Sequence, residues 1–162
     1  MHNVLIGLHA AAGVVGFGVG VAALFQQGPR SWRYPVYFAC LLLLVVFMVA
    51  VVVVDWPRLG GGTRFIYGAL ISLGLYMIWR GGHAGLRLRG AAGGWRHKYV
   101  NDIGFTLIAL FDGFVIVAAV DLDAPVWAVV LIAVLGVAVG IWAIGRVRAR
   151  LPVSTYPHAA HG

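Results

Sequence analysis

Five long apolar runs, separated by short segments rich in glycine, proline and charged residues, dominate the pattern of this chain. A transmembrane helix needs about 20 apolar residues, with a range of about 17 to 25. Four runs have this length, and the shorter third run is flanked by Arg64 and Arg80, whose long side chains can snorkel toward lipid headgroups. The pattern therefore predicts an all-α polytopic membrane protein, a five-transmembrane-helix bundle with helices over Val4 to Phe25, Pro35 to Val54, Phe65 to Trp79, Val100 to Val120 and Pro125 to Gly145.

The composition agrees with a membrane protein of one domain. Hydrophobic residues make up 62% of the 162 residues and charged residues only 10%, against about 25% in soluble domains. We expect residues 1–150 to form the membrane domain and residues 151–162 to form a disordered cytoplasmic tail. The formal charge of +7 resides mainly in the segments between apolar runs, which favours anionic lipid headgroups over nucleic acid as its counterpart. The single cysteine, Cys40, excludes an intrachain disulfide.

The distribution of lysine and arginine predicts the orientation. Basic residues are concentrated in the first connection, in the third connection and after the fifth run, whereas the other two connections hold most of the acidic residues. Cytoplasmic loops carry the excess of basic residues, so the N-terminus is predicted outside and the C-terminus inside. Met1-His2-Asn3 lacks the positive charge of a signal peptide, so the first run is interpreted as a retained helix. No eukaryotic targeting signal is seen, and a bacterial inner membrane is expected.

The segment 81–99 carries six glycines and is predicted to be a flexible cytoplasmic connector. Its basic residues are expected to bind lipid phosphates, although a specific anion site is the alternative; they are Arg87, Arg89, Arg96 and Lys98. Asn101 and Asp102 are predicted to cap the start of the fourth helix.

Small residues recur at helical spacing in two of the runs. His9, Gly13, Gly16 and Gly20 fall on one face of the first predicted helix, and Gly136 and Gly140 repeat the small-xxx-small spacing in the fifth. This spacing lets helices approach closely in lipid, within one chain or between copies.

Asp112 lies alone in the apolar stretch 105–120 and is the principal candidate for function, because an ionisable group at this depth is costly. Counted along the helices, His9, Ser72 and Asp112 share a layer about 7 to 12 Å from the outer membrane edge. Thr106 and Tyr76 complete the predicted site. We hypothesise that this layer is a proton or solute site, with hydrogen-bonded helix packing as the structural alternative.

Other chemistry is less well supported by the residues. Ser72, His9 and Asp112 are the residue types of a hydrolase, but no nucleophile motif is present, so we expect no catalytic residues and no enzymatic activity. His83 and His97 belong to the cytoplasmic side and His2 to the N-terminus, so His9 has no partner for bis-histidine haem ligation. No metal site and no cofactor are predicted, and a haem held by His9 with a different second ligand stays an alternative.

The first 35 residues resemble a group of small bacterial membrane proteins of unknown function. The resemblance rests on the sequence His9-Ala-Ala-Ala-Gly13, on the turn at Gly28-Pro29-Arg30 and on a basic loop that here contains Trp32-Arg33. It implies no established activity. From the residues we expect proton-linked movement of an ion or small solute, in a homo-oligomer or with a membrane-complex partner. The main alternative is a non-catalytic accessory subunit of a larger membrane complex.

Overall fold

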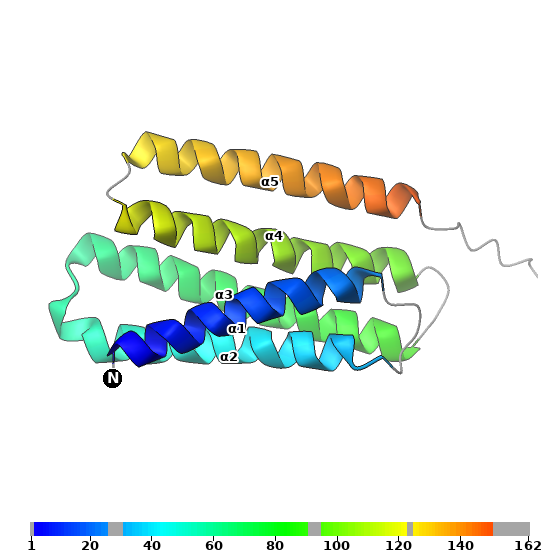
Figure 1. Cartoon of the computed structure of the whole chain (residues 1–162), viewed down its shortest axis with the longest axis horizontal. Helices are drawn as coiled ribbons and strands as arrows, with labels where there is room; N and C mark the ends of the chain where they lie inside the picture. Colours follow the sequence, from blue (N-terminus) through cyan, green and yellow to red (C-terminus); the bar gives the residue numbers. More distant parts are fainter. Residues whose placement is uncertain (1, 26–30, 91–94, 123–124, 151–162) are drawn as a thin grey trace, which may run out of the picture.

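The computed structural model describes residues 2–25, 31–90, 95–122 and 125–150, and over these ranges the chain is helical without any strand (Figure 1). The elements are α1 (His2–Leu24), α2 (Arg33–Asp55), the 3-10 turn η1 (Trp56–Arg58), α3 (Gly61–Gly90), α4 (Trp95–Asp121) and α5 (Val126–Ala149). The prediction of an all-α chain with five helices is therefore confirmed.

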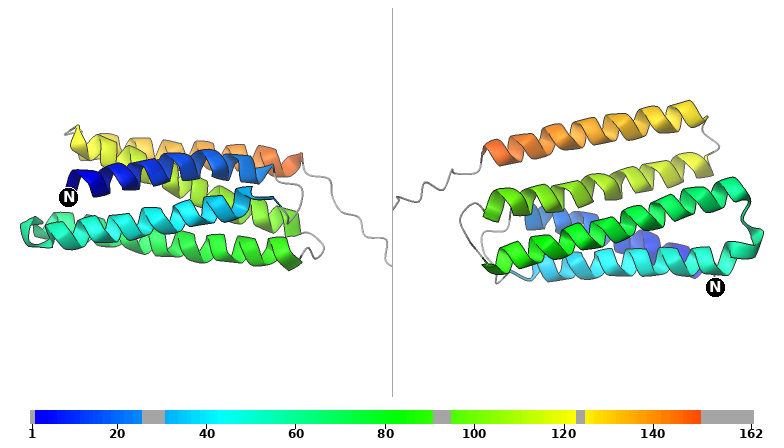
Figure 2. Two further views of the ribbon diagram at one scale, coloured as in Figure 1. Left: turned by 60° about the horizontal axis from the view of Figure 1, so that its bottom comes forward. Right: turned by 180° about the vertical axis from the view of Figure 1, so that it is seen from behind.

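Successive helices run up and down, as short connections require (Figures 1 and 2). Helices α1 to α4 form the main bundle, with the closest packing between α1 and α2 and between α3 and α4. Helix α5 packs chiefly against α4 and lies at the outside of the bundle. An apolar cavity of about 490 Å³ lies among α1, α4 and α5.

Four of the described helices have the length and apolar composition needed to cross a membrane: Val4–Leu24, Arg33–Asp55, Trp95–Ala118 and Val130–Ala149. Large apolar side chains cover their outer faces, and no residue of the most apolar part of α5 is buried within the chain. A soluble monomer rarely exposes so extensive an apolar surface, whereas lipid would cover it. The helices therefore indicate a membrane protein. Helix α3 is not among the four, so five spans and their orientation stay predictions.

The prediction of a flexible connector over 81–99 is wrong for most of its length. Helix α3 continues to Gly90 and α4 begins at Trp95. The glycines of this segment serve close packing: Tyr34 donates a hydrogen bond to the Gly81 carbonyl (2.9 Å), and a Cβ on Gly85 would collide with the Tyr34 ring. Ala84 is fully buried beside them. Helix propensity is a weak preference that such tertiary contacts override.

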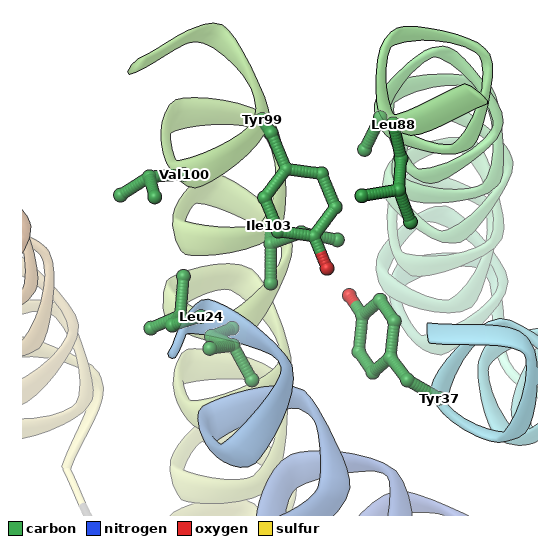
Figure 3. Close-up of a cluster of buried hydrophobic side chains, with 8 residues drawn as sticks. Leu24, Tyr37, Leu88, Tyr99, Val100 and Ile103 are labelled. Carbon is green, nitrogen blue, oxygen red and sulfur yellow. The ribbon is translucent and has the colours of Figure 1, made fainter. Parts of the chain in front are cut away.

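The best-packed core lies at the end of the bundle where α1 and α3 finish and α2 and α4 begin. Figure 3 shows Tyr37 and Tyr99 with their hydroxyl groups turned toward each other, between Leu24 and Leu88. Each hydroxyl has a hydrogen-bond partner: Tyr37 bonds Thr106, and Tyr99 donates to the Ala23 carbonyl at 3.2 Å. This core fixes the register of α4, the helix that carries Asp112.

Glycines on α1 and α5 lie at helix contacts. An added Cβ would collide with Phe114 at Gly13, would lie 3.1 Å from the Cys40 Cβ at Gly16 and 2.8 Å from the Tyr37 ring at Gly20. On α5, an added Cβ would collide with Asp112 at Gly136 and with Ile108 at Gly140. These positions bring α1 against α2 and α4, and α5 against α4.

Candidate functional site

Asp112 lies near the middle of the apolar stretch of α4 and is only 8% exposed. Its Oδ1 faces α5, where an added Cβ on Gly136 would collide with it. No described residue gives this buried oxygen a hydrogen bond. Burying a polar atom without a partner costs free energy, and most buried polar atoms in proteins are paired. The site is thus a carboxyl group held between two helices, with one buried oxygen, Oδ1, that no described donor bonds.

His9 lies on the other side of α4. Its Nδ1 is 2.9 Å from the Leu44 carbonyl oxygen, and the cavity that it lines is closed on the α4 side by residues including Leu110, Gly113 and Phe114. Asp112 instead shares its side with Ile108, which meets α5 at Gly140. His9 therefore forms its hydrogen bond with Leu44 and not with Asp112, although both residues lie within the bundle.

The other predicted members of the polar layer are engaged elsewhere. Ser72 donates to the Gly68 carbonyl of its own helix and is exposed. Thr106 is fully buried, bonds Tyr37 and donates to the Ile103 carbonyl. Tyr76 is exposed, with its ring stacked on Trp79 and edge-on to Phe105. None of them reaches Asp112 by a hydrogen bond, so the predicted residues are not joined into one network.

A charged cluster that the sequence interpretation missed joins α3 to α4. Asp102, 3% exposed, forms ion pairs with Arg80 (Nε to Oδ1, 2.9 Å) and with Arg87. The Arg80 guanidinium also lies 5.1 Å from the centre of the Phe105 ring. Asp102 follows seven residues of α4, so its prediction as a helix cap is wrong. The spacing of Arg80 and Arg87 was the available signal, because residues two turns apart share a face of a continuous helix.

This cluster changes the prediction for the basic segment. Arg87 is paired with Asp102, so lipid phosphate is not its sole partner. Arg89 and Lys98 are exposed and Arg96 is half-buried, and their binding to lipid stays a prediction.

The histidine His83 interacts within its own helix. His83 Nδ1 is 2.9 Å from the Trp79 carbonyl oxygen in the same helix, and its ring packs on the Trp79 ring. Over the described ranges, no three side chains of the types His, Cys, Asp or Glu come together as metal ligands.

Comparison of the chain with protein-family models, with curated proteins and with solved structures gives no match. The helices define a small α-helical protein of membrane type.

Proposed function

We propose that this protein is an integral membrane protein that binds and releases a proton at Asp112 and couples this to movement of an ion or small solute. The observation that carries the proposal is the buried Oδ1 of Asp112, which has no donor among the residues described. In a helix of membrane-spanning composition, an ionised carboxylate without a donor costs a few kcal/mol or more. A proton is the smallest species that removes this cost.

In the described parts of α3, α4 and α5, no unpaired cation lies close to Asp112 along the helices. On α5, the described charged side chains are Arg146 and Arg148, ten or more residues beyond Gly136, or at least about 15 Å along the helix. On α3, Arg80 and Arg87 are already paired with Asp102, Arg89 lies in the last turn, and Arg64 lies at the opposite end of the helix. On α4 itself, Arg96 and Lys98 lie in the first turn, at least about 20 Å along the helix from Asp112. The charge state of Asp112 therefore depends on what enters the site.

Helix α5 is the element that a change of charge would affect. It packs against α4 where Asp112 and Ile108 meet Gly136 and Gly140 and where Ile144 meets Gly104, and an apolar cavity lies beside it. A neutral carboxyl group is compatible with this apolar contact, whereas an ionised one favours water or a cation. Protonation thus favours one arrangement of α4 and α5, and release of the proton favours another.

The proposal places the basic end of the bundle in the cytoplasm of a bacterial cell. Five arginines lie in helix ends that are found at the same end of the structure (Figure 1): Arg33, Arg87, Arg89, Arg146 and Arg148. The positive-inside rule supports the N-terminus outside.

Substitution of Asp112 by asparagine is the test. Purified protein is reconstituted in liposomes that contain a pH-sensitive dye, and a pH gradient is imposed with Na⁺, K⁺ or Cl⁻ in turn as the accompanying ion. We expect the wild type to dissipate the gradient at least about tenfold faster than Asp112→Asn, a difference of about 1.4 kcal/mol in activation free energy. Asp55→Asn, the same change at the outer end of α2, is the matched control and should keep the wild-type rate.

Equal rates for the wild type and a folded Asp112→Asn protein, with every ion, contradict coupled transport. The second candidate is then an accessory subunit, favoured by the apolar outer face of α5 and by the missing donor at Asp112, which a basic side chain of a partner helix would supply. In that case Asp112→Asn should lose a co-purifying membrane partner that Asp55→Asn retains.

A further inference from the structure

A second feature of the bundle, on the side of α4 away from Asp112, is a partly open cavity of about 260 Å³ lined by α1, α2, α3 and α4. Its walls are almost entirely apolar and include Ile6, Leu44, Met48, Met77 and Phe114. His9 is the single lining residue whose side chain carries a nitrogen or oxygen atom. Ligand sites in proteins commonly combine an apolar enclosure with very few polar groups that set the orientation of the ligand.

The hydrogen bond of the His9 ring determines whether its other nitrogen can accept a hydrogen bond from a ligand. The Leu44 carbonyl oxygen can only accept, so Nδ1, 2.9 Å away, carries the hydrogen and donates. In the neutral ring, Nε2 is then an acceptor. No side chain or backbone group in the described part of the chain bonds Nε2. The ring is therefore held in place by one nitrogen and presents a free acceptor with the other.

The size and polarity of the cavity limit the ligand. A cavity of about 150 Å³ lined by apolar side chains accommodates benzene, so this one has room for a substituted ring. A charged ligand is disfavoured, because no described lining residue carries an opposite charge and burial of an unpaired charge is costly.

We propose that this cavity binds a small uncharged molecule, mostly apolar, that donates a hydrogen bond from a hydroxyl group to Nε2 of His9. The bilayer concentrates molecules of this kind, including lipid-soluble phenols and hydroquinones. The inference does not depend on a proton at Asp112, because the two sites lie on different sides of α4.

Gly113 provides a way to fill the cavity without disturbing the fold. It lines the cavity, yet a Cβ added there meets no atom within 4 Å. Gly68 on α3 has equally open surroundings and lies outside the cavity lining. Gly113→Leu and Gly68→Leu are therefore a matched pair with the same change in chemistry.

The test measures binding of phenol and of toluene to the purified full-length protein in detergent, by ligand-observed NMR. The two probes have similar size, but only phenol can donate. We expect both to bind the wild type and Gly68→Leu, and neither to bind Gly113→Leu. In His9→Leu, phenol affinity should fall about fivefold to tenfold, the effect of one hydrogen bond, while toluene affinity changes less than about twofold.

Two results overturn the proposal. Binding of phenol to Gly113→Leu with wild-type affinity would show that the probe lies elsewhere. Equal effects of His9→Leu on phenol and toluene would show that the cavity takes up any apolar molecule, including lipid chains, without recognising a donor.

Discussion

Replacement of Asp102 by leucine is expected to lower the free energy of unfolding by about 3 to 5 kcal/mol, the cost of removing one partner of a buried ion pair. Asp102 is 3% exposed and holds Arg80, whose side chain is only 20% exposed. Without the carboxylate, the Arg80 guanidinium would stay at the α3–α4 contact. Among the described residues, only the Phe105 ring would then interact with it. Reversible unfolding in mixed detergent micelles, followed by circular dichroism, gives this difference.

Two further variants show whether the loss of stability comes from the unpaired charge of Arg80 or from any substitution at this contact. Arg80→Met combined with Asp102→Leu removes both buried charges, and should recover most of the lost stability because an apolar pair often replaces a buried ion pair without cost. Arg87→Ala should cost less than about 1 kcal/mol, since the Arg87 side chain is 37% exposed and solvent screens its pairing. An Asp102→Leu protein as stable as the wild type would refute the structural role given to this cluster.

Substitution of Gly20 by leucine is expected to destabilise the protein by about 1 to 3 kcal/mol, the usual range for overpacking. An added Cβ would lie 2.7 Å from Leu107 and 2.8 Å from the Tyr37 ring, and both of these side chains are buried in the core. The matched change Gly18→Leu adds the same side chain where nothing lies within 4 Å. We expect Gly18→Leu to alter stability by less than about 0.5 kcal/mol.

Thermal unfolding of the two glycine variants, side by side, checks this difference. Equal melting temperatures would contradict the packing of α1 against α2 and α4 through Gly20. They would also remove support for the position of α4, because Leu107 is part of the same contact.

The helices were predictable from the sequence because each apolar run is long and bounded by polar residues. The runs 35–54, 65–79 and 100–120 lie entirely within α2, α3 and α4. The extension of α3 to Gly90 was not predictable from glycine content, because the contacts of Gly81 and Gly85 with Tyr34 and its neighbours come from a distant part of the chain.

The helix face on which His9 and Asp112 lie was harder to predict than their depth. Counting residues gives the depth of His9 and Asp112, since each helical residue advances by about 1.5 Å. It does not give the rotation of the helix. In a soluble protein, the apolar stripe of a helix reveals its inward face, but a helix surrounded by lipid is apolar on all sides. A similar predicted depth of His9 and Asp112 therefore does not imply that the two side chains are in contact.

The ion pairs of Asp102 with Arg80 and Arg87 were also not predicted from the sequence. Residues 81–99 were predicted to be a flexible connector. Arg87 was therefore not placed on the same helix as Arg80, and a shared helix face was not considered. Once α3 is continuous, both arginines face Asp102.

Coupled transport by this protein requires that Asp112 takes up and releases a proton within the bundle. Infrared difference spectra of the reconstituted protein, recorded between alkaline and acidic buffer, observe this step directly through the C=O stretching band of a protonated carboxyl group. We predict a band that is present in the wild type and in Asp55→Asn and is missing from Asp112→Asn. The same band at full intensity in Asp112→Asn would show that the proton binds elsewhere, and would contradict the proposed role of Asp112.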